Sequence, residues 1–383
     1  MANFKKHSTG WEFRLKYKDP FTQKFKEKSQ RGFETKKEAQ LAAAEFERKV
    51  LQGYEQSDIP LVDYLYNWVE KYKKDTVRKN TIRSHLNNIK NHIEPYFKKL
   101  YLSDLKPDMY QAFLDYCVDS NMSRRSIEIV NSTMYAALER ATIQGKIERN
   151  PSYGSIIKKE KSKRQVKFID SDDIPRFLQQ AHRYGYIYWI FFKVLIATGM
   201  RKGEAAALKW SDIDFKNCTI TIDETLDFQA SNDEELFGET KTGKSERKIK
   251  ISQNIVNDLR FQMNWQNQNK LNLGSLYKYE LNLVLCRKDG NFMPKSTLFN
   301  AFSRILKRSD LPSLPIHSTR HTCAVVMLEA GADMKYVQEY LGHGSIKITS
   351  DVYSHISKKL EQRNTQKIEA YTDKIFGGDL GAD

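Results

Sequence analysis

Five side chains in the second half of the 383-residue chain carry functional groups that suit one reaction. They are Arg201, His317, Arg320, His343 and Tyr353. Guanidinium groups donate paired hydrogen bonds to phosphate oxygens, an imidazole accepts a proton, and a phenol can act as a nucleophile. The phenol needs a base because its pKa is about 10, so only about one in a thousand is ionised at pH 7. The set predicts metal-free attack of a tyrosine on a phosphate diester.

The order and spacing of these residues resemble those of the tyrosine recombinases, the integrases of phages and conjugative transposons. The matching segments are ATGMRKGE at 197–204, HSTR at 317–320, LGH at 341–343 and DVY at 351–353. Tyr353 lies ten residues after His343 and 33 after Arg320. Four separate segments match one family pattern in order, which is a much more specific signal than any single residue.

The resemblance implies roles for these residues at the DNA phosphate. His317 is the implied proton acceptor, and it lies three residues before Arg320 at the start of an expected helix, which puts both side chains on one face. Arg201 and Arg320 suit the extra negative charge of the transition state, which fixed donors stabilise more than they stabilise the substrate. His343 would donate a further hydrogen bond to the same phosphate.

The resemblance also implies a lysine, on a strand hairpin, that protonates the departing 5′ oxygen. We assign Lys241 to this role, with Lys244 and Lys248 as nearby rivals. Tyr353 would then hold the 3′-phosphate covalently, so the strand is rejoined without ATP, metal or any other cofactor.

Other interpretations of the same residues are structural. Arg201 and Glu204 could form an ion pair, and His321 and His355 could join His317 and His343 in a metal site. The histidines lack the short ligand pairs of a zinc site, and the four cysteines are scattered without any CxxC pair. We expect no metal, no disulfide framework and structural roles for His321 and His355.

The net charge of +15 predicts a polyanionic partner, because Lys and Arg contacts to phosphates release counterions. No run approaches the roughly 18 apolar residues of a membrane span, and the first residues lack an apolar signal core. We therefore expect a cytoplasmic protein of a bacterial host, associated with the nucleoid, that binds double-stranded DNA.

Residues 1–57 form the first predicted domain. Strands are expected at 11–17, at 21–28 and around 32–33, followed by a helix that a capping box at Thr35 and Glu38 opens. Eleven basic and four acidic residues lie between 4 and 37, and this segment resembles the arm-binding module of lambda-type integrases. The candidate DNA contacts here are Arg14, Lys16, Lys18, Lys24, Lys26 and Lys28.

Residues 58–155 carry four apolar stripes of helical period, which predict a four-helix domain. The resemblance implies that this is the SAM-like core-binding domain. Residues 156–167 form a basic linker, and 168–383 form a mostly helical catalytic domain in which strands at 218–223 and 247–252 pair. The fold class is thus multidomain and mainly α, with mixed α/β in the catalytic part. Further candidate DNA contacts are Lys79, Arg83, Arg124, Arg125, Lys163 and Arg164.

The resemblance implies core and arm sites on DNA, a homotetramer in which each C-terminal helix packs on a neighbouring protomer, and partners such as an excisionase and a host DNA-bending protein. The function it implies is site-specific integration and excision of a mobile element. Two alternatives stay open: a type IB topoisomerase-like strand cutter, and a DNA-binding regulator without chemistry. The N-terminal module argues against the first, and the intact residue set argues against the second.

Overall fold

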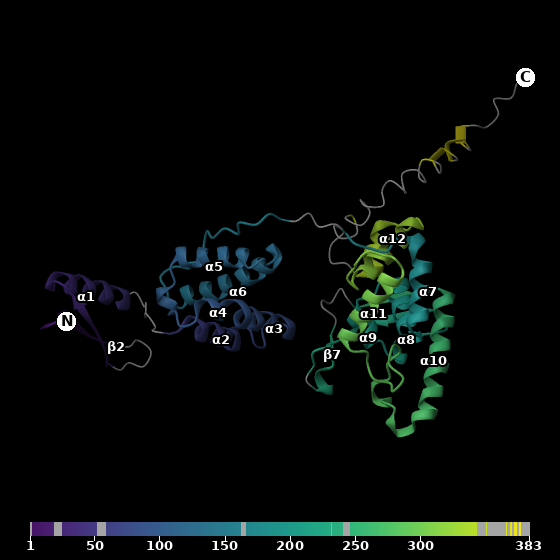
Figure 1. Cartoon of the computed structure of the whole chain (residues 1–383), viewed down its shortest axis with the longest axis horizontal. Helices are drawn as coiled ribbons and strands as arrows, with labels where there is room; N and C mark the ends of the chain where they lie inside the picture. The colour runs from purple at the N-terminus through teal and green to yellow at the C-terminus, as the bar shows by residue number, and fades with distance from the viewer. Residues whose placement is uncertain are drawn as a thin grey trace, which may run out of the picture. The chain divides into compact units, whose positions relative to one another are not determined.

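The computed structural model describes residues 2–18, 25–51, 59–161, 166–230, 232–239, 246–342, 350, 365, 368–369, 371–373 and 375–376. The chain divides into two compact units, residues 1–163 and 164–383 (Figure 1). The first unit contains two separate hydrophobic clusters, one on the N-terminal sheet and one among the helices that follow. The division between the units falls inside the predicted linker, and the domain bounds predicted above remain a prediction.

A three-stranded antiparallel sheet begins the first unit, in the order β1 (Ala2–His7), β2 (Gly10–Lys18) and β3 (Phe25–Phe33). Helix α1 (Lys36–Leu51) covers one face, where its Ala43 packs with Phe13 and Leu15 of β2. The predicted capping box is confirmed in part: Glu38 N–H donates to Thr35 Oγ1 at 3.2 Å, and the Glu38 carboxylate accepts from the N–H of Glu34 rather than of Thr35. The fold prediction of three strands and one helix is confirmed.

The positions of two of these strands were predicted wrongly. β1 was missed, because Phe4 is the only large apolar residue of a short and basic edge strand. The strands expected at 21–28 and 32–33 are one strand, β3, as far as the described residues 25–33 extend. Gly32, which was placed in the third expected strand, lies inside β3 at φ +95°, where the register with β2 shifts by one residue.

Four helical segments with a shared core follow, as predicted. α2 (Leu61–Tyr72) begins after Pro60, α5 (Pro107–Asp119) starts with its proline, and α6 (Arg124–Ile143) is capped by Ser123. The second predicted helix is a continuous run of three pieces: α3 (Lys79–Asn88), a π-helical turn at 89–93 and α4 (Glu94–Phe97). Pro95 has no N–H for the carbonyl four residues earlier, so the helix widens before it.

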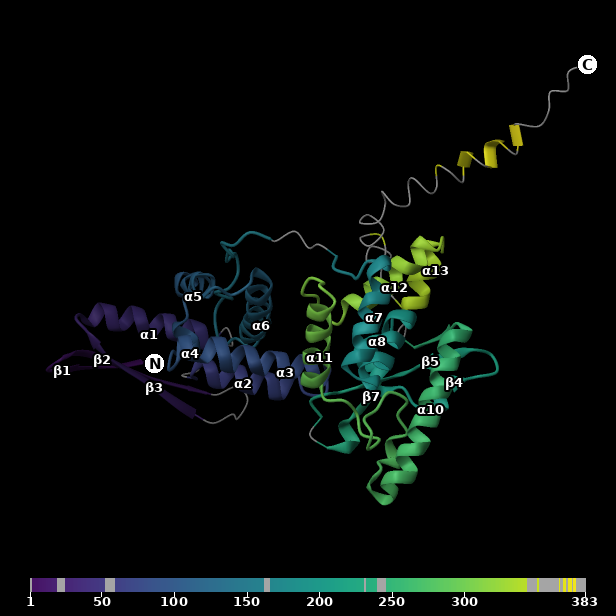
Figure 2. The same ribbon diagram turned by 45° about the vertical axis from the view of Figure 1, so that its right-hand side comes forward.

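The second unit is built around helix α8 (Tyr186–Thr198), which contacts α7 (Ile174–Tyr184), α10 (Gln253–Leu273) and α12 (Ser318–Glu329) (Figure 2). α8 is apolar on almost every side, as a central helix must be. Helices α9 (Lys202–Ala207), α11 (Lys295–Arg308) and α13 (Met334–Leu341) also belong to this unit.

Two small sheets lie in the second unit, where one was predicted. β5 (Thr219–Ile222) pairs with β8 (Arg247–Lys250), as expected, and β4 (Ile213–Asp214) joins them. A separate hairpin pairs β6 (Glu224–Leu226) with β7 (Phe237–Glu239). This hairpin lies between the two predicted strands, where no strand was predicted.

The C-terminal helical prediction lies largely outside the described residues. Ile368, Tyr371 and Ile375 of this segment are described; they are helical, and each is more than half exposed. Among the helices that the structure describes, none is long and apolar enough to span a bilayer.

Candidate active site

Arg201 lies where the buried helix α8 gives way to α9. The turn depends on Gly199, at φ +61°, because a Cβ there would collide with the side chain of Leu341. The backbone N–H of Arg201 donates to Glu204 Oε2 at 2.9 Å, and its Nη1 donates to Glu204 Oε1 at 2.5 Å. The Arg201 side chain is still 31% exposed, so a fixed guanidinium is accessible to a ligand.

Arg320 lies in the first turn of α12 and is only 1% exposed. Its Nη1 donates to the carbonyl of Gly199 at 2.8 Å, and its Nη2 donates to the carbonyl of Leu341. Burial and the charges of Arg201 and Arg247 lower the pKa of Arg320 to about 9, which leaves it a cation at pH 7. The site therefore holds two positive guanidiniums close together before any anion arrives.

Three arginines from three elements donate to three consecutive carbonyls at the end of α13. Arg247 Nε reaches Tyr340 O at 3.0 Å, Arg320 Nη2 reaches Leu341 O, and Arg201 Nη2 reaches Gly342 O at 3.5 Å. The last carbonyls of a helix have no partner within it and lie at the negative end of its dipole. The arginines therefore fasten the chain immediately before His343, the next residue in the sequence.

Glu204 links two of these arginines. Its carboxylate is 3% exposed, and it accepts from Arg201 and, at 2.9 Å, from Arg247 Nη2. Burial alone would raise the pKa of Glu204, but Arg247 and Arg201 more than offset it and the net shift is downward. Glu204 is thus an ionised support for Arg201, and the ion pair that was considered as an alternative interpretation of the two residues is present.

Arg247 was missed as a site residue. It lies on β8 in the alternating run of Arg247, Ile249 and Ile251 against Lys248 and Lys250. The two isoleucines are buried and the two lysines are exposed. An arginine on the buried face of a strand was the signal that sequence reasoning had available, since a buried charge requires a partner.

His317 caps the start of α12, one turn before Arg320. Its ring centroid lies 5.2 Å from that of His321. Packing around the ring lowers the pKa of His317, and the positive charges of Arg320 and Arg201 add to this effect. The residue as a whole is exposed. A neutral imidazole at pH 7, open to a ligand and beside two guanidiniums, has the form that a proton acceptor requires.

The structure thus brings Arg201, His317 and Arg320 together. Lys241, His343 and Tyr353, and the rival Lys244, lie outside the described residues, so their roles remain predictions. Lys248 is described and exposed on β8. Among the described residues, no group of three or more His, Cys, Asp or Glu side chains could hold a metal ion.

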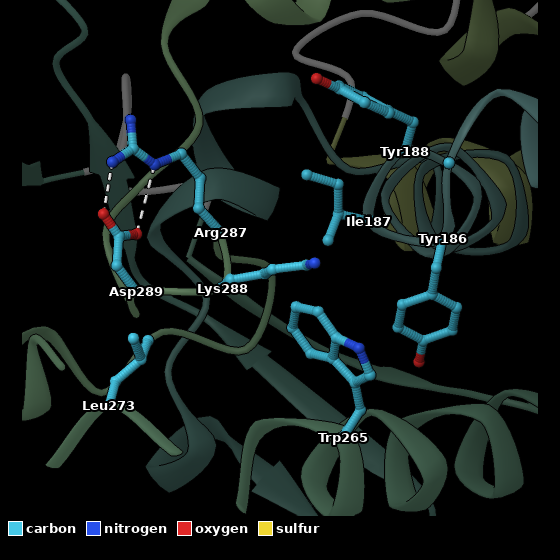
Figure 3. Close-up of a pocket in the computed structure, with 9 residues that line it drawn as sticks. Tyr186, Ile187, Tyr188, Trp265, Leu273, Arg287, Lys288 and Asp289 are labelled. Atoms are coloured by element: carbon cyan, nitrogen blue, oxygen red, sulfur yellow. Dashed lines mark hydrogen bonds and ion pairs between the residues drawn. The ribbon is translucent and has the colours of Figure 1, made fainter. Parts of the chain in front are cut away.

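A separate hollow of about 760 Å³ lies elsewhere in the second unit (Figure 3). Its apolar wall includes Tyr186 at the start of α8 and Trp265 of α10, and Arg287 and Asp289 form an ion pair at its edge. Arg201, His317 and Arg320 are not among its lining residues. The hollow is therefore distinct from the group of Arg201, Arg247 and Arg320, which we call the arginine cluster.

The candidate DNA contacts of the N-terminal sheet divide between its two faces. Cross-strand pairing puts Arg14, Lys16 and Lys18 on the face opposite α1. Lys26 and Lys28 pair with Tyr17 and Leu15, which lie on the face that α1 covers. Lys24 lies outside the described residues. The first three residues are therefore the better placed for a groove.

The other candidate DNA-contacting side chains differ in the hydrogen bonds and ion pairs that they already make within the protein. Arg124 Nη1 donates to the carbonyl of Ile157 at 2.9 Å, so this side chain fastens the segment after α6. Arg125 is 65% exposed, with a weak ion pair to Glu128 at 3.3 Å. Lys79 and Arg83 lie on α3 and have partners of their own. Lys163 and Arg164 lie outside the described residues.

Three family models match successive parts of the chain. The phage integrase family model matches residues 167–359, the phage integrase N-terminal SAM-like domain matches 61–117, and the arm DNA-binding domain matches 3–50. Two of these ranges, 3–50 and 61–117, lie inside the first and second predicted domains, and the third begins at the last residue of the predicted linker.

Similar proteins include a tyrosine recombinase XerC-like protein of Caldanaerobacter subterraneus, 26% identical over 88% of this chain and 90% of the relative. The ICEBs1 integrase of Bacillus subtilis is 22% identical over 73% of this chain and 75% of the relative. Both names refer to recombinases or integrases.

Solved structures share the fold. The Tn1549 transposon integrase in complex with transposon right end DNA aligns with a TM-score of 0.64 at 18% identity, over 81% of this chain and all of that chain. A lambda integrase dimer bound to a core site aligns with a TM-score of 0.59 at 19% identity, over 91% of this chain and 94% of that one. The phage integrase model alone spans half of the sequence, and the chain belongs to this family of tyrosine-type site-specific recombinases.

Proposed function

We propose that this recombinase cuts one DNA strand at a time with the hydroxyl of Tyr353. The phenolic oxygen attacks the phosphorus, the bond to the 5′ oxygen breaks, and the 3′-phosphate becomes esterified to the tyrosine. His317 accepts the phenolic proton, since its ring is neutral and exposed beside the two arginines. Attack by the 5′ hydroxyl of another strand reverses the same steps, so the bond energy is conserved.

The arginine cluster is the observation that carries this proposal. Arg201 and Arg320 are fixed by Glu204 and by the carbonyls of Gly199 and Leu341, so their charges need no reorganisation when the transition state forms. The 3.5 Å contact from Arg201 Nη2 to Gly342 O is the longest in the cluster, and a phosphate oxygen would replace it. His343, the next residue, would donate to the same phosphate.

Lys241 is proposed as the acid that protonates the departing 5′ oxygen. We expect Lys241→Ala to slow cleavage of ordinary DNA and to recover largely on a substrate whose 5′-bridging oxygen is sulfur, because a thiolate leaves without protonation. The measurement is single-turnover cleavage on both substrates. Lys244→Ala is the control, and recovery in Lys244→Ala but not in Lys241→Ala would show that the acid was chosen wrongly.

The proposed substrate is double-stranded DNA at core sites, which the helical and catalytic domains bind, and at arm sites, which the N-terminal sheet binds. A solved relative is a lambda integrase tetramer bound to a Holliday junction, and we propose the same assembly here, with the C-terminal segment packing on a neighbouring protomer. An excisionase and a host DNA-bending protein are proposed partners. The proposed location is the bacterial cytoplasm, on the nucleoid, since its relatives are bacterial and phage recombinases.

A nicked core-site duplex tests this function. After cleavage the short 5′ product diffuses away, so a recombinase accumulates as a covalent adduct with DNA and then joins added partner strands. Recombinant products support strand exchange between duplexes. Adducts with relaxation of supercoils but no recombinants would favour the type IB topoisomerase-like activity, and binding without adducts would favour a regulator.

Deleting residues 1–57 should separate two kinds of DNA recognition, because the N-terminal sheet has its own hydrophobic cluster and holds none of the proposed catalytic residues. We expect the truncated protein to cleave and rejoin a short core-site duplex but not to recombine long attachment sites. Its loss of affinity for long sites should depend steeply on salt, as the loss of several phosphate contacts requires. Gel-shift and cleavage assays at two salt concentrations measure both effects, and equal binding of long sites would contradict the arm assignment.

A further inference from the structure

The face of the N-terminal sheet opposite α1 is polar, and we call it the open face. Strand pairing aligns Lys5, Glu12 and Arg31 across the three strands, with Arg14 next to Glu12 along this face of β2. Side chains that pair across strands share a face. The shift of register at Gly32 puts Arg31 on the open face and Phe33, two residues later, against Phe13 on the other.

A buried carboxylate lies in the middle of this polar face. Glu12 is 0% exposed, and three side chains surround its oxygens. Arg31 Nε donates to Oε1 at 3.0 Å, Arg14 Nε donates to Oε1 at 3.1 Å, and His7 Nε2 lies 2.6 Å from Oε2. Burial alone would raise the pKa of Glu12, but hydrogen bonds from Arg31, His7 and Arg14 lower it to about 2, so the carboxylate is ionised at pH 7.

The carboxylate leaves one edge of each guanidinium for a ligand. A guanidinium has two donor edges, one that includes Nε and one formed by Nη1 and Nη2. Glu12 takes the Nε edge of both arginines, and Arg14 adds a long Nη2 contact at 3.5 Å. Within the described residues the terminal nitrogens of Arg31 have no other hydrogen bond. The side chains of Arg14 and Arg31 are 46% and 62% exposed, so their outer edges are accessible.

The chemistry of the cluster favours a base edge over a phosphate. An ionised carboxylate about 3 Å from both guanidiniums weakens their attraction for a second anion. A guanine edge is uncharged and presents two acceptors, O6 and N7, to a planar pair of donors in the major groove. Flexible lysines such as Lys16, exposed on the same face, already suffice for phosphates.

We propose that Arg14 and Arg31 are a guanine-reading pair and that Glu12 is the positioning residue that fixes their orientation. The proposal rests on the proposed arm function and specifies which bases that function reads. A two-stranded ribbon fits the major groove of B-DNA, so β2 and β3 would enter it together. Glu12 reduces the rotamer freedom that the arginines would otherwise lose on binding.

The test uses the full chain and a library of random duplexes attached to a fixed core site. We expect the wild type to enrich a motif with two guanines. Arg14→Lys and Arg31→Lys should each relax one guanine position, with a loss of about tenfold to a hundredfold on the motif. Lys16→Ala is the control on the same strand and face. It should weaken binding to all sequences alike and reduce the salt dependence, as a phosphate contact does.

Modified bases identify the contacted atoms. Replacing a motif guanine by 7-deazaguanine removes N7, and it should cost wild-type affinity about tenfold but cost the corresponding Arg→Lys variant little. Inosine, which lacks only the minor-groove amino group, should bind as guanine does.

The Glu12→Gln variant tests whether Glu12 positions the two arginines or only stabilises the fold. It keeps the size of the side chain but removes the negative charge, so we expect lower affinity for the motif and higher affinity for random duplexes. A purely structural role would lower both. If the wild type selects no motif beyond the core site, the arm function itself fails. If it selects one and all three variants retain it with an unchanged 7-deazaguanine penalty, the arm function stands and the guanine-reading pair is wrong.

Discussion

Tyr353→Phe should abolish covalent attachment to DNA, with a fall in cleavage of more than ~10⁴-fold, because the variant lacks the only atom that attacks the phosphorus. The substitution removes one hydroxyl and changes no charge, so affinity for a core-site duplex should change less than about threefold. The measurements are adduct formation on a nicked duplex, by denaturing electrophoresis, and binding by gel shift.

Tyr336→Phe is the matched control for this variant. Tyr336 is an exposed tyrosine of α13, seventeen residues before Tyr353 in the sequence. The Tyr336→Phe variant should cleave DNA at the wild-type rate. If Tyr353→Phe still formed adducts, the nucleophile would be another residue. If both variants lost activity, the loss would reflect the fold near α13 rather than the chemistry of Tyr353.

Helices whose ends carry a proline or glycine, or whose apolar residues recur with a helical period, were predictable from the sequence. α2 and α5 begin where Pro60 and Pro107 indicate, because proline lacks the N–H that a first helical turn does not use. α6 ends just before Gly145, whose φ of +67° favours glycine. These signals are local, so they need no knowledge of tertiary contacts.

Features that depend on partners distant in the sequence were not predictable in the same way. β1 is short and basic, and it is a strand because β2 pairs with it. Glu12 is completely buried, and three side chains from other positions of the sheet contact its carboxylate. Its partner Arg31 is nineteen residues away, and the register shift at Gly32 that aligns them has no sequence signature beyond the glycine itself.

The candidate active site contains both kinds of feature, those predictable from local sequence and those that depend on distant partners. Arg201, His317 and Arg320 were identified from the spacing of their motifs, and in the structure they lie close enough to interact. The contribution of α13 was not foreseen: its last carbonyls accept from Arg247, Arg320 and Arg201. Backbone acceptors have no residue type, so a search for functional side chains does not find them.

Arg320 has both a structural and a proposed catalytic role, so we expect its substitution to have a large effect on cleavage. Its guanidinium bonds the carbonyls of Gly199 and Leu341 and, in the proposed mechanism, a phosphate oxygen as well. Lysine has one nitrogen and cannot span the two carbonyls. Arg320→Lys should therefore slow cleavage by about 10²–10³-fold, since that is the usual effect of removing one fixed donor from a transition state. Single-turnover cleavage at saturating DNA measures it.

Arg201→Lys separates the catalytic from the structural part of this effect. Arg201 is 31% exposed and Arg320 is 1% exposed, so both variants should lose cleavage, but Arg320→Lys should lose more stability. Two carbonyls that Arg320 now satisfies would be left partly unpaired in a buried site, at a cost of about 1–3 kcal/mol each. Thermal unfolding of both variants measures this difference. Equal melting temperatures would mean that the carbonyls of Gly199 and Leu341 find other donors. Full cleavage by Arg320→Lys would mean that charge alone, without the paired geometry of a guanidinium, stabilises the transition state.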